Sequence, residues 1–195
     1  MKTLKLSALV LLSILIVSTT GCVSVTSSPD VESSYYDDPN PVTSDSPYFH
    51  AVEVGKTEGF VGTNAFWISG RVSPNLTNES AKEVLEKTLS SSNMLAQNGQ
   101  AQYQLDAIMV DDDAVGAFAS ETSLNGTTRD MSIRYILRSL KTTAELYNEV
   151  IVSHGEGTCD DACFAFYIQE SYAAERSQVD SLRQLVADLK ALPVD

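Results

Sequence analysis

Basic residues are scarce in this chain, which has 13 lysines and arginines against 26 aspartates and glutamates. Nucleic acids and anionic membrane surfaces both attract cationic proteins, so this balance predicts no nucleic-acid partner and no electrostatic attraction to a membrane. The sequence also lacks a phosphate-binding glycine loop, a G-x-S-x-G nucleophile motif and any internal repeat with a period of about 20–50 residues. These absences argue against the common nucleotide-binding enzymes, the α/β-hydrolases and the repeat folds.

Histidines are few as well. Only His50 and His154 occur, and neither has a local nucleophile or a second metal ligand beside it. Asp111-Asp112-Asp113 lacks the spaced oxygen ligands and the turn glycine of an EF-hand calcium loop. We therefore predict no catalytic residue, no metal site and no cofactor, and expect that the protein is not an enzyme.

The start of the chain has the pattern of an export signal. Lys2 and Lys5 precede an apolar run from Leu6 to Val17, and small residues then lead to Gly21-Cys22. The run is shorter than the roughly 20 residues that a membrane-spanning helix needs. Its end resembles the lipobox of bacterial lipoproteins, although Thr19 stands where that motif usually has leucine. The resemblance implies cleavage before Cys22 and attachment of diacylglycerol and a further acyl chain, such as palmitate, to that residue. An ordinary secretory signal followed by a chance cysteine is the alternative.

The position of the mature protein follows from the same region. No later stretch reaches transmembrane length, so the lipid on Cys22 would be its only membrane attachment. Val23, rather than aspartate, follows the cysteine, which in many Gram-negative bacteria implies the outer membrane. Removal of residues 1–21 takes away Lys2 and Lys5 but no acidic residue, leaving 11 basic and 26 acidic residues and a net charge of −15.

The mature chain divides by composition into two parts. Residues 22–47 begin with the lipidated cysteine and are rich in Ser, Thr, Pro and Asp with no apolar period, which predicts a disordered tether with a reach of roughly 25–30 Å. Residues 48–195 are long enough for a single periplasmic domain with its own core.

Apolar periodicity predicts the elements of that domain. Spacings of three and four predict helices over Thr77–Ser91, with Thr77 as its N-cap, and over Phe164–Leu192. Alternation predicts strands over 48–54, 102–110, 128–139 and 145–153. The expected inward residues of the last two strands are Met131, Ile133, Tyr135, Leu137, Leu146, Val150 and Val152, and the expected apolar stripe of the final helix is Ile168, Tyr172, Val179, Leu182, Val186 and Leu189. The order strand, helix, three-strand meander, helix predicts an α+β fold, a mostly antiparallel sheet with two helices packed on one face.

Two groups of residues are candidate sites. Cys159 and Cys163 form an even pair in an oxidising compartment, and their spacing lets a disulfide form, although free thiols and metal or redox chemistry are alternatives. Phe60, Phe66, Trp67 and Phe118 lie in segments that read as loops. They form a candidate partner surface, because aromatic residues are enriched at interfaces, or they fold back into the core.

Several segments between Tyr48 and Leu192 resemble a family of small proteobacterial envelope lipoproteins. They are Y-F-H-A-V-E-V-G-K-T-E-G-F, F-W-I-S, Y-Q-L-D-A, S-I-R-Y-I-L, L-Y-N-E-V-I-V-S and E-R-S-Q-V-D-S-L. Members often carry the label UDP-N-acetylglucosamine acyltransferase, but such enzymes are cytoplasmic β-helices with hexapeptide repeats, which this sequence lacks. The order of elements is similar to that of the LPS-assembly lipoprotein and of the auxiliary lipoproteins of ABC transporters.

These features together predict a lipid-anchored protein on the periplasmic face of the outer membrane. Its expected role is to bind an envelope assembly or transport protein, or a lipid-like ligand. An acyltransferase or another envelope enzyme is the alternative, and a structural role in the envelope is a third.

Overall fold

The computed structural model describes residues 28–66, 71–97, 99–112, 122–123, 126–162 and 166–193. The predicted signal peptide and three of the predicted site residues, Cys22, Trp67 and Phe118, lie outside these ranges, as does Cys163.

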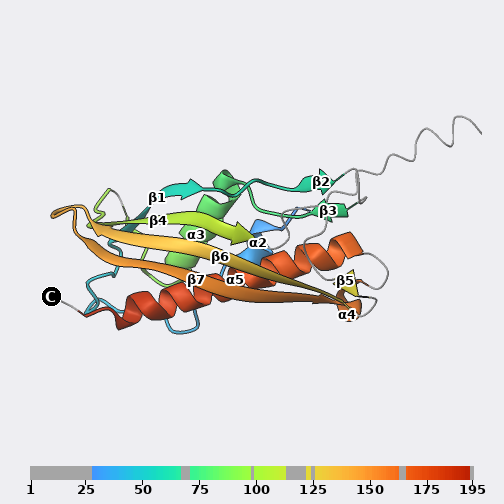
Figure 1. Cartoon of the computed structure of the whole chain (residues 1–195). Coiled ribbons are helices and arrows are strands. Elements are labelled where there is room, and N and C mark those ends of the chain that lie inside the picture. Colours follow the sequence, from blue (N-terminus) through green and yellow to red (C-terminus); the bar gives the residue numbers. More distant parts are fainter. Residues whose placement is uncertain are drawn as a thin grey trace, which may run out of the picture.

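One long sheet forms the centre of the molecule (Figure 1). Its main strands are β1 (Val52–Glu58), β4 (Tyr103–Asp112), β6 (Gly126–Ser139) and β7 (Glu145–Thr158), and the short β5 (Thr122–Ser123) pairs with the start of β6. β1 is parallel to β4, whereas β4, β6 and β7 form an antiparallel meander. β2 (Asn64–Phe66) and β3 (Arg71–Ser73) make a separate two-stranded ribbon. The predicted α+β fold with a mostly antiparallel sheet is confirmed.

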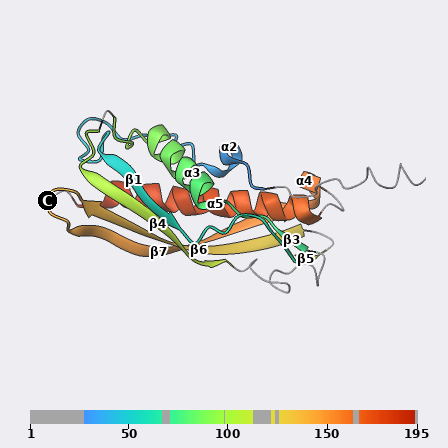
Figure 2. The same ribbon diagram turned by 90° about the horizontal axis from the view of Figure 1, so that it is seen from above.

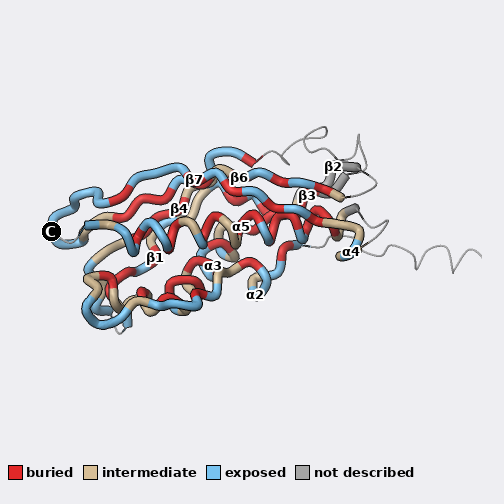
Figure 3. The backbone as a smooth tube through the Cα atoms, turned by 90° about the horizontal axis from the view of Figure 1, so that it is seen from below, coloured by how far each residue is buried: buried red, intermediate tan, exposed pale blue. Residues whose placement is uncertain are grey.

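Two long helices, α3 (Asn78–Ser91) and α5 (Phe166–Ala191), lie on one face of the sheet (Figure 2). α3 contacts β1 and α5 contacts β6 and β7; the short helices are α2 (Val31–Ser34) and α4 (Cys159–Ala162). The Thr77 hydroxyl accepts a hydrogen bond from the Ser80 amide at 3.1 Å, which confirms the predicted N-cap. Buried positions gather where α5 meets the strands (Figure 3). The core there contains Leu85, Leu89, Leu105, Ile133, Leu137, Leu182, Leu185 and Leu189.

The inward face of β7 differs from the prediction. Val150 and Val152 are exposed, as is Leu146, while Tyr147, Ile151 and Ser153 are buried. Side chains alternate along a strand, so a prediction that starts one residue out places the whole set on the wrong face. The face is chosen by Gly155 and Gly157, which follow on the same side and let the backbone of α5 approach the strand closely.

The same close approach changes the buried stripe of α5. Leu182, Val186 and Leu189 are buried as predicted, but Tyr172 is 37% exposed. The first half of the helix instead buries small or polar side chains, namely Gln169, Ala173, Ala174, Ser177 and Ser181. A helix that lies against a glycine-lined strand has room for little more than small side chains.

The predicted disordered tether is wrong for residues 28–47, which we call the N-terminal strap. The Tyr36 amide donates to Thr88 Oγ1 in α3 at 3.1 Å, and the Val42 amide donates to the Ser92 carbonyl at 3.0 Å. The strap also packs Val31, Tyr35, Tyr36 and Val42 against the core. A composition rich in Ser, Pro and Asp predicted disorder, but four spaced apolar side chains and acceptors on α3 are enough to hold the segment. The folded unit therefore includes residues 28–47 as well as the residues from 48 onward.

Candidate functional site

The side of the sheet that faces away from α3 and α5 is the candidate functional surface, which we call the open face. Alternate residues of each strand point to it, because their neighbours point into the core. On the three meander strands these residues are Gln104, Asp106, Ile108, Asp111, Ser132, Arg134, Ile136, Arg138, Asn148, Val150, Val152, His154 and Glu156, and the exposed Val110 is the extra residue of a β-bulge between Met109 and Asp111. An antiparallel sheet commonly leaves one face to water, but that face is then mostly polar.

The middle of the open face is apolar and accessible. Val110 is 52% exposed, Val150 40% and Val152 63%. The register places Arg134 of β6 between Ile108 of β4 and Val150 of β7. Val152 lies opposite Ser132, so Val150 and Val152 form an exposed apolar strip on β7 beside this cation. Contiguous exposed apolar surface of this kind is typical of sites that bind a partner.

Arg134 differs from most cations of this chain. Within the described ranges no carboxylate lies at ion-pair distance from it. Within the described part of the chain, the lysines and arginines that do pair with a carboxylate are Lys56, Lys82, Lys87, Arg129, Arg138, Arg176, Arg183 and Lys190. An exposed guanidinium with no carboxylate at ion-pair distance keeps its capacity to bind a carboxylate or another anion of a partner.

Asp106 shows the contrasting arrangement on the open face. It accepts hydrogen bonds from the Lys56 amide at 2.8 Å and Gln104 Nε2 at 3.1 Å, and pairs with Arg138 at 2.5 Å. Burial alone would raise the pKa of Asp106, but these three donors together hold it below its usual range. The carboxylate is therefore ionised and already has its hydrogen-bond donors, whereas no ion-pair partner of Arg134 is found among the described residues.

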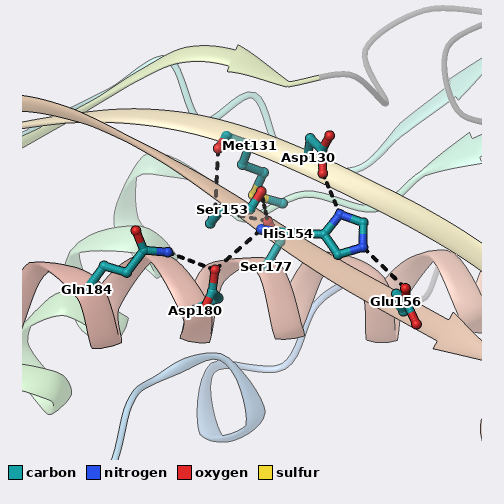
Figure 4. A network of polar contacts seen from close by, with 8 residues as sticks. All are labelled: Asp130, Met131, Ser153, His154, Glu156, Ser177, Asp180 and Gln184. Carbon is teal, nitrogen blue, oxygen red and sulfur yellow. Dashed lines mark hydrogen bonds and ion pairs between the residues drawn. The ribbon is translucent and has the colours of Figure 1, made fainter.

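His154 of β7 lies on the open face, with its ring between Asp130 and Glu156 (Figure 4). Its Nδ1 is 2.6 Å from Asp130 Oδ1 and its Nε2 is 3.3 Å from Glu156 Oε1. The hydrogen bond with Asp130, followed by that with Glu156, raises the pKa of His154. Both ring nitrogens are engaged by carboxylates, and the neighbouring Ser153 points to the opposite face and bonds Ser177 at 3.0 Å. The group is a charge cluster and does not have the geometry of a nucleophile with its base.

Side chains of α5 engage two backbone groups near the C-terminal end of the free edge of β7. The His154 amide donates to Asp180 Oδ2 at 3.4 Å, and Arg176 donates to the Glu156 carbonyl. Engaged backbone groups of this kind prevent another strand from adding to an edge. This end of the β7 edge is therefore closed to an added strand, and the face of the sheet beside it stays accessible.

Two hollows lie at the end of the domain that holds the β6–β7 turn. The first has a volume of about 410 Å³ and is lined by Pro47, Tyr48, Tyr103, Ser139, Thr142, Ala144, Leu146, Leu192 and Pro193. The second, of about 470 Å³, contains Tyr147 and Asp188, whose side chains share a 2.6 Å hydrogen bond; burial, and then this bond, raises the pKa of Tyr147. Neither lining contains a histidine or a cysteine. Among the residues that the structure describes, no group of three potential ligands is placed to hold a metal ion.

The predicted site residues do not come together in the described structure. Phe60 is only 4% exposed and packs in the core, so it is not available to a partner, which corrects its assignment to a partner surface. Phe66 ends β2, and its side chain is outside the described set; Trp67 and Phe118 are wholly outside it. Cys159 begins α4, but the predicted disulfide with Cys163 and the lipidation of Cys22 stay predictions. The sequence did contain a signal for the open face, since Val150, Val152, His154 and Glu156 alternate, but the valines had been assigned to the core.

Comparisons with known proteins show the fold and nothing finer. No protein-family model matches the chain, and no curated protein matches it. Protein XCC0632 from Xanthomonas campestris, of family DUF330, aligns with a TM-score of 0.51 at 10% identity, covering 78% of this chain and 87% of that one. A proposed lipoprotein from Caulobacter crescentus aligns with a TM-score of 0.48 at 19% identity, covering 72% of this chain and 89% of that one. Hypothetical protein CT253 from Chlamydia trachomatis aligns with a TM-score of 0.45 at 10% identity, covering 73% of this chain and 96% of that one. The likeness to XCC0632 supports the α+β architecture, while the predicted lipoprotein family has no match in sequence.

Proposed function

We propose that this protein is an outer-membrane lipoprotein that binds a partner in the cell envelope through the open face of its sheet. Cys22 would carry the lipid and hold the domain on the periplasmic side. The observation that carries the binding role is the exposure of Val110, Val150 and Val152 on the two strands that flank Arg134, a cation with no ion-pair partner among the described residues. A partner that covered the valines and supplied a carboxylate to Arg134 would bury apolar area and form a charge-assisted hydrogen bond together.

The membrane attachment rests on the sequence of the first 22 residues. No helix in the described part of the chain has both the length and the apolar character to cross a membrane. The lipobox-like end at Gly21-Cys22 supplies the attachment instead, and two or more acyl chains make a stable anchor.

A binding role fits the described surface better than the alternative of an acyltransferase or another enzyme. An enzyme needs a nucleophile or general base placed beside a substrate cavity. The hollows near Leu146 and Leu192 are lined by tyrosines, aliphatic side chains and a few carboxylates, and His154 lies far along β7, held between two carboxylates. An envelope protein is the partner that the apolar strip with its cation favours, and a lipid-like ligand is the second candidate.

In-cell photo-crosslinking tests the proposal. A photoreactive amino acid at Val152 should give a discrete cross-linked product, and the same residue at Ala187, exposed on α5, should not. Arg134→Glu should abolish the product, while Lys141→Glu, the same charge change in the β6–β7 turn, should leave it intact. Labelling with an alkyne fatty acid tests the anchor, since Cys22→Ser should lose the label. Cross-linking at Val152 that is unaffected by Arg134→Glu would show that Arg134 does not contribute to binding, and the absence of any product at Val152 would show that the open face is not the binding surface.

A further inference from the structure

The N-terminal strap is fastened to the domain at its first described residues. Ser28 Oγ lies 2.9 Å from Thr63 Oγ1, just before β2, and the Asp30 amide donates to Glu175 Oε1 at 2.9 Å. Figure 1 shows β2 and β3 at the end of the molecule opposite to the C-terminus. The chain therefore enters the folded domain at the β2–β3 end.

From that entry point the strap runs along α5 and is held again at the far end of the helix. Lys190 Nζ donates to Asp38 Oδ2 at 2.6 Å and to the Asn40 carbonyl at 2.8 Å. The Asp38 side chain is only 2% exposed in this contact. Fifteen residues of α5 separate Glu175 from Lys190, which corresponds to about 22 Å of helix.

The middle of the strap is held by α3. Ser91 Oγ donates to the Tyr36 carbonyl at 2.9 Å and receives a hydrogen bond from the Asp38 amide at 3.2 Å. Lys87 pairs with Glu32 at 2.6 Å. Because both backbone and side-chain groups are engaged along its length, the strap is part of the domain and does not act as a spacer.

This docking leaves a short connection to the lipid. If Cys22 carries the anchor, only residues 23–27 separate it from Ser28, and a fully extended chain of that length spans about 20 Å. With the strap undocked, the connection would extend to Pro47 and could span about 90 Å. We propose that the docked strap keeps the β2–β3 end of the domain within about 20 Å of the membrane, so that the partner is a protein embedded in, or lying on, that same membrane.

The size of the domain limits how far the open face can lie from the membrane. α5 contains 26 residues and is about 39 Å long, so every part of the sheet beside it stays within roughly 60 Å of the lipid headgroups. A released strap would more than double that reach. The inference rests on the proposed anchoring at Cys22 and narrows the class of partner.

Fluorescence quenching on vesicles tests the proposal. The lipidated chain is reconstituted into phosphatidylethanolamine–phosphatidylglycerol vesicles that carry a quencher on the headgroups. A dye is placed through an unnatural amino acid at Thr128, at the start of β6, or at Thr142, in the β6–β7 turn. We expect stronger quenching at position 128 than at position 142.

A strap-release variant supplies the decisive comparison. Glu175→Ala with Lys190→Glu removes the acceptor for Asp30 and repels Asp38, and should abolish the difference in quenching. Glu145→Ala with Lys141→Glu makes the same charge changes away from the strap and should preserve it. Amide hydrogen exchange should show loss of protection in residues 28–42 of the release variant alone, with β6 still protected, which separates strap release from unfolding.

Two results would overturn the inference, and each is distinct from failure of the anchor. One is a wild-type strap that exchanges its amide hydrogens as fast as an unfolded chain. The other is equal quenching at positions 128 and 142 in wild-type protein that floats with the vesicles. Failure to float would count against the anchoring at Cys22 itself, and the proposed class of partner would fall with it.

Discussion

Gly155 of β7 lies directly against the carbonyl oxygen of Ala173 in α5, and a Cβ at position 155 would be 2.0 Å from that oxygen. Two residues on, a Cβ at Gly157 would be 1.9 Å from the Gln169 carbonyl oxygen. The obstructing atoms are backbone atoms of a packed helix, so they cannot move aside as a flexible side chain could. Glycine at these two positions determines which face of β7 meets the helix.

Gly155→Ala should therefore destabilise the protein strongly. Forcing a methyl group into a closely packed interface costs about 1–3 kcal/mol, and we expect the upper end because the helix must move as a whole. The free energy of unfolding in urea measures the loss. Val152→Ala, on the exposed face of the same strand, should cost less than about 1 kcal/mol. Equal stability of Gly155→Ala and wild type would show that α5 does not approach β7 in this way.

Much of the fold could be predicted from the sequence, because local periodicity decides it. Alternation along β6 predicted its inward face correctly, including Ile133, Tyr135 and Leu137, and the spacing in α3 predicted the helix with its cap at Thr77. The face of β7 could not be predicted in the same way. Both of its faces carry apolar residues, and the deciding contact, Gly155 with Ala173, joins segments that are separate in the sequence.

The candidate site was harder to predict for a related reason. Val150 and Val152 are apolar and alternate, which predicted that they belong to the core. The surface they form can be recognised only from the sheet and its register. The strap was missed because its composition resembles that of disordered chains, whereas its stability comes from partners on distant helices. Lys190 and Asp38, for example, are 152 residues apart.

Leu182 tests whether α5 belongs to the core. Its side chain is 1% exposed, and Leu182→Ala should cost about 2–5 kcal/mol, since both the transfer energy and a residual cavity contribute. Thermal and urea unfolding of the mature chain measure the effect. The control is Leu146→Ala, at a position that is 37% exposed, and it should cost much less. A melting temperature of Leu182→Ala within a degree or two of wild type would contradict the packing of α5.

Arg129 and Asp112 form a buried ion pair, and removing only one of the two charges should destabilise the protein. Arg129 Nε is 3.0 Å from Asp112 Oδ1 and its Nη2 is 2.5 Å from Oδ2, and Asn75 also donates to this carboxylate. Arg129→Met should cost about 3–5 kcal/mol, because it leaves the Asp112 charge buried without its partner. The double variant with Asp112→Leu should recover much of that loss. A double variant that is less stable than Arg129→Met alone would show that the pair contributes more than charge balance.

Cys159 and Cys163 should be oxidised to each other in protein taken from the cell envelope. The closed ring is short, so the expected stabilisation is roughly 2 kcal/mol. Alkylation without reductant, followed by mass spectrometry, should find both thiols protected, and reduction should release exactly that pair. Quantitative alkylation of both cysteines before reduction would rule the disulfide out.

The pH response of His154 can be derived from its two carboxylate neighbours. Asp130, at 2.6 Å, and then Glu156, at 3.3 Å, raise the pKa of His154 above the value of about 6.5 that an unfolded chain would have. A raised pKa in the folded state contributes stability that is fully present below the unfolded-state pKa. That stability is lost as the pH rises through the folded-state pKa. The side chain is 54% exposed, so solvent screening keeps the effect on stability small and the titration itself is the better measurement.

An NMR titration of the imidazole signals should therefore show an apparent pKa for His154 above that of unfolded histidine. Asp130→Asn should lower it more than Glu156→Gln does, because the shorter hydrogen bond is the larger cause. Neither change touches Arg134 or the valines of the open face, so cross-linking at Val152 should survive both at neutral pH. Unchanged titration in Asp130→Asn would mean that the 2.6 Å contact does not form in solution, and the cluster at this end of the open face would then be two free carboxylates beside an ordinary histidine.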